Sequence, residues 1–90
     1  MFRYNANTLK HMEDLLKAAG YTLRYEKGSF KPGFCILENK RVAVVNKFYG
    51  MEARINALME IINHLQITRE QLPEDHWKLL EEITAQNASA

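Results

Sequence analysis

The stretch FCILENKRVAVVN, residues 34–46, decides the fold of this chain. Its two apolar runs flank Asn39-Lys40, a pair that suits the two-residue turn of a β-hairpin. The second run, 42–45, is apolar on both faces, which is typical of the most covered strand of a sheet. We therefore expect a hairpin at the centre of the fold.

A helical pattern follows the hairpin. Between about Glu52 and Leu65, apolar residues recur at spacings of three and four, which predicts a helix with one buried stripe. A third helix is predicted from about Pro73 to Thr84, because proline suits a first turn and the next two residues are acidic. Residues 86–90 have little to bury, so we expect a frayed tail there.

Upstream of the hairpin, the sequence predicts one helix and one strand. The helix runs from Thr8 to Ala19, with Asn7 as its N-cap and Gly20 as the residue that ends it. Residues 21–26 alternate, with apolar or aromatic side chains at the odd positions, as in a strand that is wet on one face.

These elements predict a single α+β domain over residues 1–85, since 90 residues suffice for one domain. We expect a helix, a three-stranded antiparallel β-meander, and then two helices packed on one face of the sheet. No apolar run reaches the ~20 residues of a membrane span, and the N-terminus lacks the pattern of a secretory signal. With one cysteine and hence no internal disulfide, these features indicate a cytoplasmic protein.

Charge is unevenly distributed, although the net charge is only +1. Residues 21–54 carry a net charge of +4 and residues 55–90 a net charge of −4. Either the two halves attract each other, within the fold or across a dimer, or the basic half attracts an anionic partner such as a nucleic acid. The candidate anion-binding or partner-binding residues are Lys27, Lys31, Arg41, Lys47 and Arg54.

Two observations argue against a built anion or nucleic-acid site. Residues 27–33, with two glycines and a proline, are predicted to form a loop, but a strand follows it where phosphate-binding loops need a helix. Tyr21 and Tyr25 share a strand face with Leu23, which makes them core residues rather than a platform for stacked bases. A surface loop and solvated charges are the favoured interpretation, with nucleic-acid binding as an alternative.

Candidate catalytic and metal-binding residues are few. Glu60 and His64 are four residues apart on the second predicted helix and so share a face, as metal ligands on a helix do. No Cys-x-x-Cys or paired-His spacing supplies further ligands, so an exposed helix pair is the favoured interpretation. Cys35 lies in an apolar strand, which favours a buried side chain over a nucleophile. We find no complete catalytic constellation, and we predict no cofactor and no enzymatic activity.

The order of helix, strand, hairpin ending in Val44-Val45-Asn46-Lys47, and further helix resembles the start of the ImmA/IrrE-type zincin-like metallopeptidases. The resemblance covers roughly Leu9 to Leu65. In that family the last of these helices carries H-E-x-x-H, which supplies two zinc ligands and the general base. If His64 corresponds to the second histidine, Glu60 stands at the first and Ile61 at the catalytic glutamate. Isoleucine cannot activate water, so the resemblance implies an inactive relative or a scaffold of similar shape.

The leading hypothesis is a non-enzymatic protein-interaction or regulatory module with an unknown protein partner. A three-stranded sheet with one covered face leaves a wet face and open edges, which are natural contact surfaces and are compatible with a homodimer. The alternatives are the inactive zincin-like core and a binder of nucleic acid or another anion through the basic region. Residues 25–47 are also similar to small uncharacterised bacterial proteins, a resemblance that implies no activity.

Overall fold

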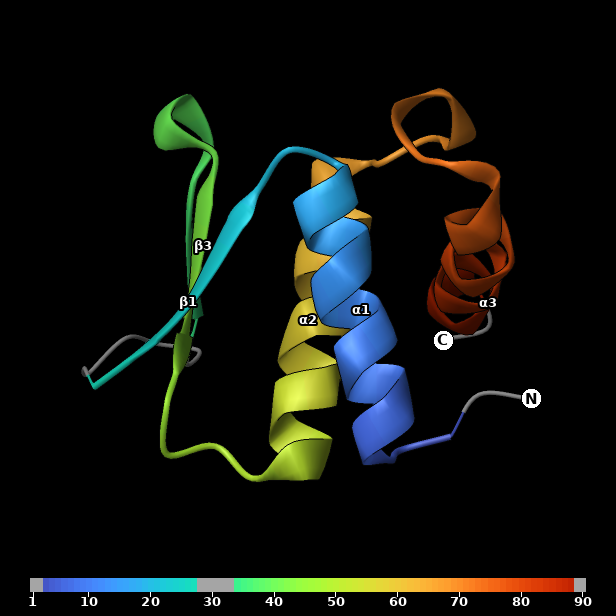
Figure 1. The fold of residues 1–90 in the computed structure, drawn as a ribbon. Helices are drawn as coiled ribbons and strands as arrows, with labels where there is room; N and C mark the ends of the chain where they lie inside the picture. The colour runs from blue at the N-terminus through green and yellow to red at the C-terminus, as the bar shows by residue number, and fades with distance from the viewer. Residues whose placement is uncertain (1–2, 28–33, 89–90) are drawn as a thin grey trace.

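The computed structural model describes residues 3–27 and 34–88, and these form an α+β fold, as the sequence predicts. A helix, a three-stranded sheet and two further helices follow one another along the chain (Figure 1). The main elements are α1 (Ala6–Ala18), β1 (Thr22–Glu26), β2 (Phe34–Leu37), β3 (Val42–Asn46), α2 (Met51–Leu65) and α3 (Trp77–Ala88).

The sheet is mixed, so the predicted antiparallel meander is wrong. The strand order is β1-β3-β2, in which β2 pairs antiparallel with β3 and β1 pairs parallel with β3. A meander would have placed β2 in the middle and paired β1 with it. Strand β3 takes the middle position because it is apolar on both faces, and Ala43, Val44 and Val45 are all buried there.

The hairpin between β2 and β3 is present, but its connection differs from the expected two-residue turn. Glu38–Lys40 form a 3₁₀ turn, and Arg41 follows in the left-handed conformation with φ 53°. The Arg41 N–H donates to the Glu38 carbonyl at 3.2 Å, and the Arg41 carbonyl accepts the Thr22 N–H at 2.9 Å. Arg41 therefore ends the turn and begins the pairing of β1 with β3.

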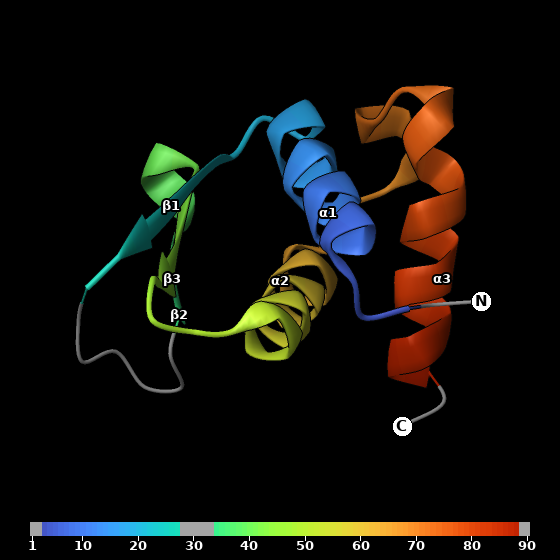
Figure 2. The ribbon, with the colours of Figure 1, turned by 60° about the horizontal axis from the view of Figure 1, so that its bottom comes forward.

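The elements form three layers, which are the sheet, then α1 with α2, and then α3 (Figures 1 and 2). Helix α1 lies against β1 and α2 against β3, whereas α3 packs on α1 and α2. The prediction that both C-terminal helices lie on the sheet is therefore wrong for α3. Three strands about 4.8 Å apart form a surface about 10 Å wide. Packed helix axes lie about 8–10 Å apart, so two helices are enough to cover this surface.

The hydrophobic core lies on both sides of the α1–α2 layer. On the sheet side, the covered face presents Leu23, Tyr25, Phe34, Ile36, Ala43 and Val45, which belong to the core or pack against it. The helices contribute the buried residues Met12, Leu15, Leu16, Ile55, Leu58, Ile61, Ile62, Leu80 and Ile83. One continuous core thus joins all three layers.

Helix α1 begins two residues earlier than predicted, at Ala6 rather than Thr8, because Asn5 is its N-cap. The Asn5 side chain accepts the Thr8 N–H at 2.9 Å. The helix ends at Ala18, one residue before the predicted Ala19, and Gly20 follows the C-cap Ala19 with φ +90°, the left-handed conformation that was predicted for it. This short turn returns the chain along the helix, so β1 lies beside α1.

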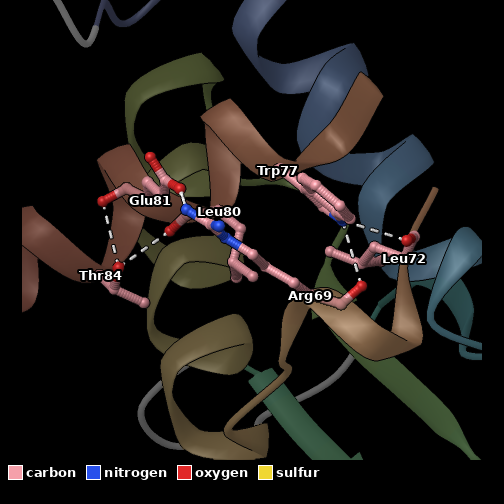
Figure 3. A network of polar contacts seen from close by, with 6 residues as sticks. All are labelled: Arg69, Leu72, Trp77, Leu80, Glu81 and Thr84. Carbon is pink, nitrogen blue, oxygen red and sulfur yellow. Dashed lines mark hydrogen bonds and ion pairs between the residues drawn. The ribbon is translucent and has the colours of Figure 1, made fainter. Parts of the chain in front are cut away.

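Helix α3 is attached to the segment before it by a tryptophan and an arginine (Figure 3). The Trp77 Nε1–H donates to the carbonyls of Arg69 at 3.1 Å and Leu72 at 3.2 Å. The Arg69 guanidinium lies 5.4 Å from the centroid of the Trp77 ring and pairs with Glu81. These contacts fix the entry into α3 while its apolar side packs on α1 and α2.

The bounds of α3 differ from the prediction at both ends. It begins at Trp77 rather than at Pro73, because Glu74–His76 form a 3₁₀ turn first. It continues to Ala88, beyond the predicted end and into the segment that was expected to be frayed. No helix among the described residues combines the length and the apolar character that crossing a membrane requires.

Candidate interaction surfaces

A groove of 410 Å³ runs between helix α1 and the outer strand β1. We call it the α1–β1 groove. The helix contributes three charged residues, and the strand side is apolar or aromatic except for one threonine. The lining residues are Glu13, Asp14, Lys17, Tyr21, Thr22, Leu23 and Tyr25. The groove therefore combines apolar and aromatic residues on the strand side with charged residues on the helix side, which we call its rim.

Strand β1 is an edge strand, and alternate backbone groups along it point away from the sheet. The Thr22 N–H donates to the Arg41 carbonyl at 2.9 Å, and the Glu26 carbonyl accepts the Lys47 N–H at 3.0 Å. In a parallel pair of strands this pattern means that the backbone N–H and C=O groups of the even-numbered residues of β1 bond to β3. The N–H and C=O groups of Leu23 and Tyr25 consequently face the free edge, with which no strand of the described chain pairs.

Tyr25 connects three elements at one end of the groove. Its hydroxyl donates to Glu13 Oε2 on α1 at 2.5 Å, and the guanidinium of Arg54 on α2 lies 4.4 Å from the centroid of its ring. Burial raises the pKa of the Tyr25 hydroxyl well above its usual value, and the Glu13 carboxylate raises it further, while Arg54 lowers it. Tyr25 is therefore a protonated hydrogen-bond donor at neutral pH.

Arg54, one of the five predicted basic residues, holds the connection between β3 and α2. Its Nε–H donates to the Tyr49 carbonyl at 2.9 Å, and its Nη2–H donates to the Lys47 carbonyl at 2.8 Å. The guanidinium also contacts the Tyr25 ring, so Arg54 makes its contacts within the protein and has a structural role. A second of the five, Lys31, lies with the rest of residues 28–33 outside the described part of the chain.

The remaining basic residues do not share one surface. Lys27 and Lys47 follow the last residues of β1 and β3, so they lie at the same end of the sheet as Arg54. Arg41 precedes the first residue of β3 and lies at the opposite end. The described positive charge is thus divided between the two ends of the sheet.

The sheet face opposite the helices is covered by none of the described helices. Its central side chains, which we call the open sheet face, are Cys35, Leu37, Val42 and Val44. Leu37 is 43% exposed, and Cys35 is a half-buried free thiol rather than a fully buried one. At the border of this face, Arg24 Nε pairs with Glu26 Oε2 at 2.6 Å.

The predicted metal candidates, Glu60 and His64, are both exposed on α2. Within residues 3–27 and 34–88, no group of three His, Cys, Asp or Glu side chains is placed to hold a metal ion. Glu60 lines a hollow of 210 Å³ beside Phe34 and Tyr49, and His64 is not part of that lining. The described structure brings no third ligand to this pair.

No family model, curated protein or solved structure matches this chain. Functional conclusions therefore depend on the surfaces themselves. Sequence reasoning missed Glu13 and Asp14 as groove residues, because on the sequence they are only the polar side of an amphipathic helix. The available signal was the turn at Gly20, which places that helix beside the alternating strand that follows.

Proposed function

We propose that this chain is a non-enzymatic interaction module that binds a protein partner at the α1–β1 groove. The observation that carries the proposal is the coincidence of two features at one place. A groove of 410 Å³ lies beside a free strand edge, where the backbone groups of Leu23 and Tyr25 face outward. A partner that supplies a strand would satisfy these groups and fill the groove.

The character of β1 supports this proposal. Proteins usually protect an exposed strand edge by a proline, a bulge or a covering segment, because unpaired N–H and C=O groups attract other chains. Strand β1 consists of five residues with no proline, and Arg24 and Glu26 are the charged side chains that limit unselective pairing at this edge.

We also assign the protein to the cytoplasm, because its single cysteine, Cys35, has no partner for a disulfide within the chain.

The experiment is photo-crosslinking in the source cells. A photoreactive benzoylphenylalanine replaces Lys17 on the groove rim, and the matched control carries the same group at Glu52, which is exposed on α2 away from the groove. We expect discrete crosslinked proteins from position 17 and not from position 52. Equal crosslinking at both positions, or none at position 17 in a folded protein, would overturn the proposal.

A second candidate function is self-association through the open sheet face. On this face Leu37 is 43% exposed and Val42 is half-buried, and no described helix covers them, so they form the kind of apolar patch that two copies can bury. Sedimentation velocity tests it with Leu37→Glu and the control Met51→Glu, since Leu37 is 43% and Met51 40% exposed. A dimer that only Leu37→Glu dissociates supports this candidate, and a monomeric wild-type protein removes it.

A further inference from the structure

We infer that the ligand of the α1–β1 groove is an extended peptide segment of a partner protein with lysine or arginine at alternate positions. It binds as a fourth strand on β1. This inference rests on the proposed function and names the chemistry that the groove recognises.

The backbone of β1 accounts for binding as a strand. Leu23 and Tyr25 present N–H and C=O groups to the free edge, spaced as in any strand whose alternate residues face a neighbour. An extended peptide placed there continues the sheet by main-chain hydrogen bonds. Such strand addition gives affinity independent of sequence, so the side chains must supply the selectivity.

The rim of the groove accounts for the basic residues. In a strand paired with β1, alternate side chains point toward the helix layer and enter the groove. There they meet the apolar surfaces of Leu23 and Tyr25, and then the carboxylates of Glu13 and Asp14 at the rim. A lysine or arginine fits both, because its methylene stem packs on apolar surface while its charge stays at the edge.

The charges at the rim are available for a ligand. Asp14 has no ion pair with any described residue, and Glu13 accepts the Tyr25 hydroxyl through only one of its two oxygens. Lys17 lies one helical turn beyond Glu13 and is the only basic residue that lines the groove among those described. The lining therefore carries two carboxylates and one ammonium, and the Arg54 guanidinium contacts the Tyr25 ring without being part of the lining.

The helix layer favours a peptide over a second copy of this chain. Helix α1 packs on β1, so two copies joined at β1 would place two α1 helices over adjacent strands (Figures 1 and 2). Adjacent strands are about 4.8 Å apart, whereas packed helix axes need about 8–10 Å. A bare peptide strand brings no helix and avoids this overlap.

The test is fluorescence anisotropy with a labelled peptide, Thr-Lys-Thr-Lys-Thr-Lys-Thr, and two matched peptides. One replaces each lysine by glutamate, and the other has the same composition without alternation, Lys-Lys-Lys-Thr-Thr-Thr-Thr. We expect saturable binding of the alternating lysine peptide, at least about tenfold tighter than either control peptide. Asp14→Lys should weaken it about tenfold, whereas Glu60→Lys, the same charge change on the exposed side of α2, should leave it within about twofold.

Amide hydrogen exchange separates strand addition from simple charge attraction. In the free protein, the N–H groups of Thr22 and Arg24 should exchange slowly and those of Leu23 and Tyr25 quickly. The alternating peptide should protect Leu23 and Tyr25. Binding without that protection, or equal binding of all three peptides, overturns the inference. A groove crosslink to a cellular protein with no peptide binding would leave the proposed function standing and remove only this inference.

Discussion

Arg54 joins helix α2 to the end of the sheet through the carbonyls of Tyr49 and Lys47 and the ring of Tyr25. Arg54→Ala removes these contacts together, and we expect the free energy of unfolding to fall by about 2–3 kcal/mol. Urea titration measures the change. Lys47→Ala is the control, because its ammonium lies over the exposed ring of Phe48, and we expect a change below about 0.5 kcal/mol. Equal effects of the two substitutions would show that Arg54 does not hold this connection.

The Tyr25 hydroxyl makes the free energy of unfolding depend on pH in the alkaline range. Burial and Glu13 raise the pKa of the folded hydroxyl, whereas in the unfolded chain it ionises near pH 10. The contribution is complete below about pH 10 and is lost as pH rises above it, because only the unfolded chain then gains by releasing the proton. Tyr25→Phe should cost about 1 kcal/mol at neutral pH but flatten the decline between about pH 9 and 11.

Urea titrations at each pH provide the measurement for Tyr25. Glu13→Gln is the companion variant, since it keeps the shape of the side chain but removes the charge that raises the tyrosine pKa. Its decline with pH should lie between those of the wild type and Tyr25→Phe. Identical slopes in all three proteins would show that the Tyr25–Glu13 contact is not maintained in solution.

At the scale of elements, the turn between α1 and β1 requires a glycine, whereas the turn before α2 does not. Gly20 has φ +90°, and an added Cβ would lie 3.1 Å from Arg41 Nη1. Gly50 is the N-cap of α2 with φ −74°, and nothing lies within 4 Å of an added Cβ. Gly20→Ala should therefore cost about 1–2 kcal/mol, and Gly50→Ala at most a few tenths.

Thermal unfolding of the two alanine variants measures the difference between the glycines. Because Gly20 sets the angle at which β1 leaves α1, its substitution should also reduce peptide binding in the groove. Gly50→Ala should leave that binding unchanged. If Gly20→Ala proves as stable as Gly50→Ala, the left-handed turn is not the conformation that the protein uses.

The elements themselves could be predicted from the sequence, but the order of the strands could not. Alternation at Leu23 and Tyr25 correctly identified the side of β1 that faces the core. The same alternation holds whether β1 pairs with β2 or with β3, because both arrangements bury the same side chains. The apolar run at Val42–Val45 did indicate a central strand, and that signal was the correct guide to the β1-β3-β2 order.

At the scale of the whole molecule, the layering could not be read from helix patterns alone. The stripe of α3 shows that this helix has a buried side, but no periodicity shows whether that side meets a sheet or other helices. The width of the sheet determines where α3 packs. Because α1 and α2 already cover the sheet, α3 packs on these two helices. The groove depends on the same arrangement, because Glu13 and Asp14 meet β1 only when α1 lies on that edge.

The division of positive charge makes a prediction about nucleic acids. Lys27 and Lys47 lie at one end of the sheet and Arg41 at the other, while Arg54 bonds to backbone carbonyls. A protein that neutralises few phosphates at once gains little affinity from them, and added salt weakens even this binding. We therefore expect labelled mixed-sequence RNA and DNA to bind weakly at low salt and not measurably at about 0.15 M salt.

Anisotropy titrations at the two salt concentrations check this expectation about nucleic acids, with Lys27→Glu/Lys47→Glu and Arg41→Glu as variants. If the binding is diffuse attraction, each variant should weaken it at low salt in proportion to the charge removed, so that the double variant has the larger effect. Micromolar binding that persists at the higher salt and is abolished by a single one of these variants would indicate a built site. The nucleic-acid alternative would then replace the peptide groove as the leading function, because binding that keeps its affinity as salt rises depends on contacts other than phosphate neutralisation, such as base stacking or hydrogen bonds.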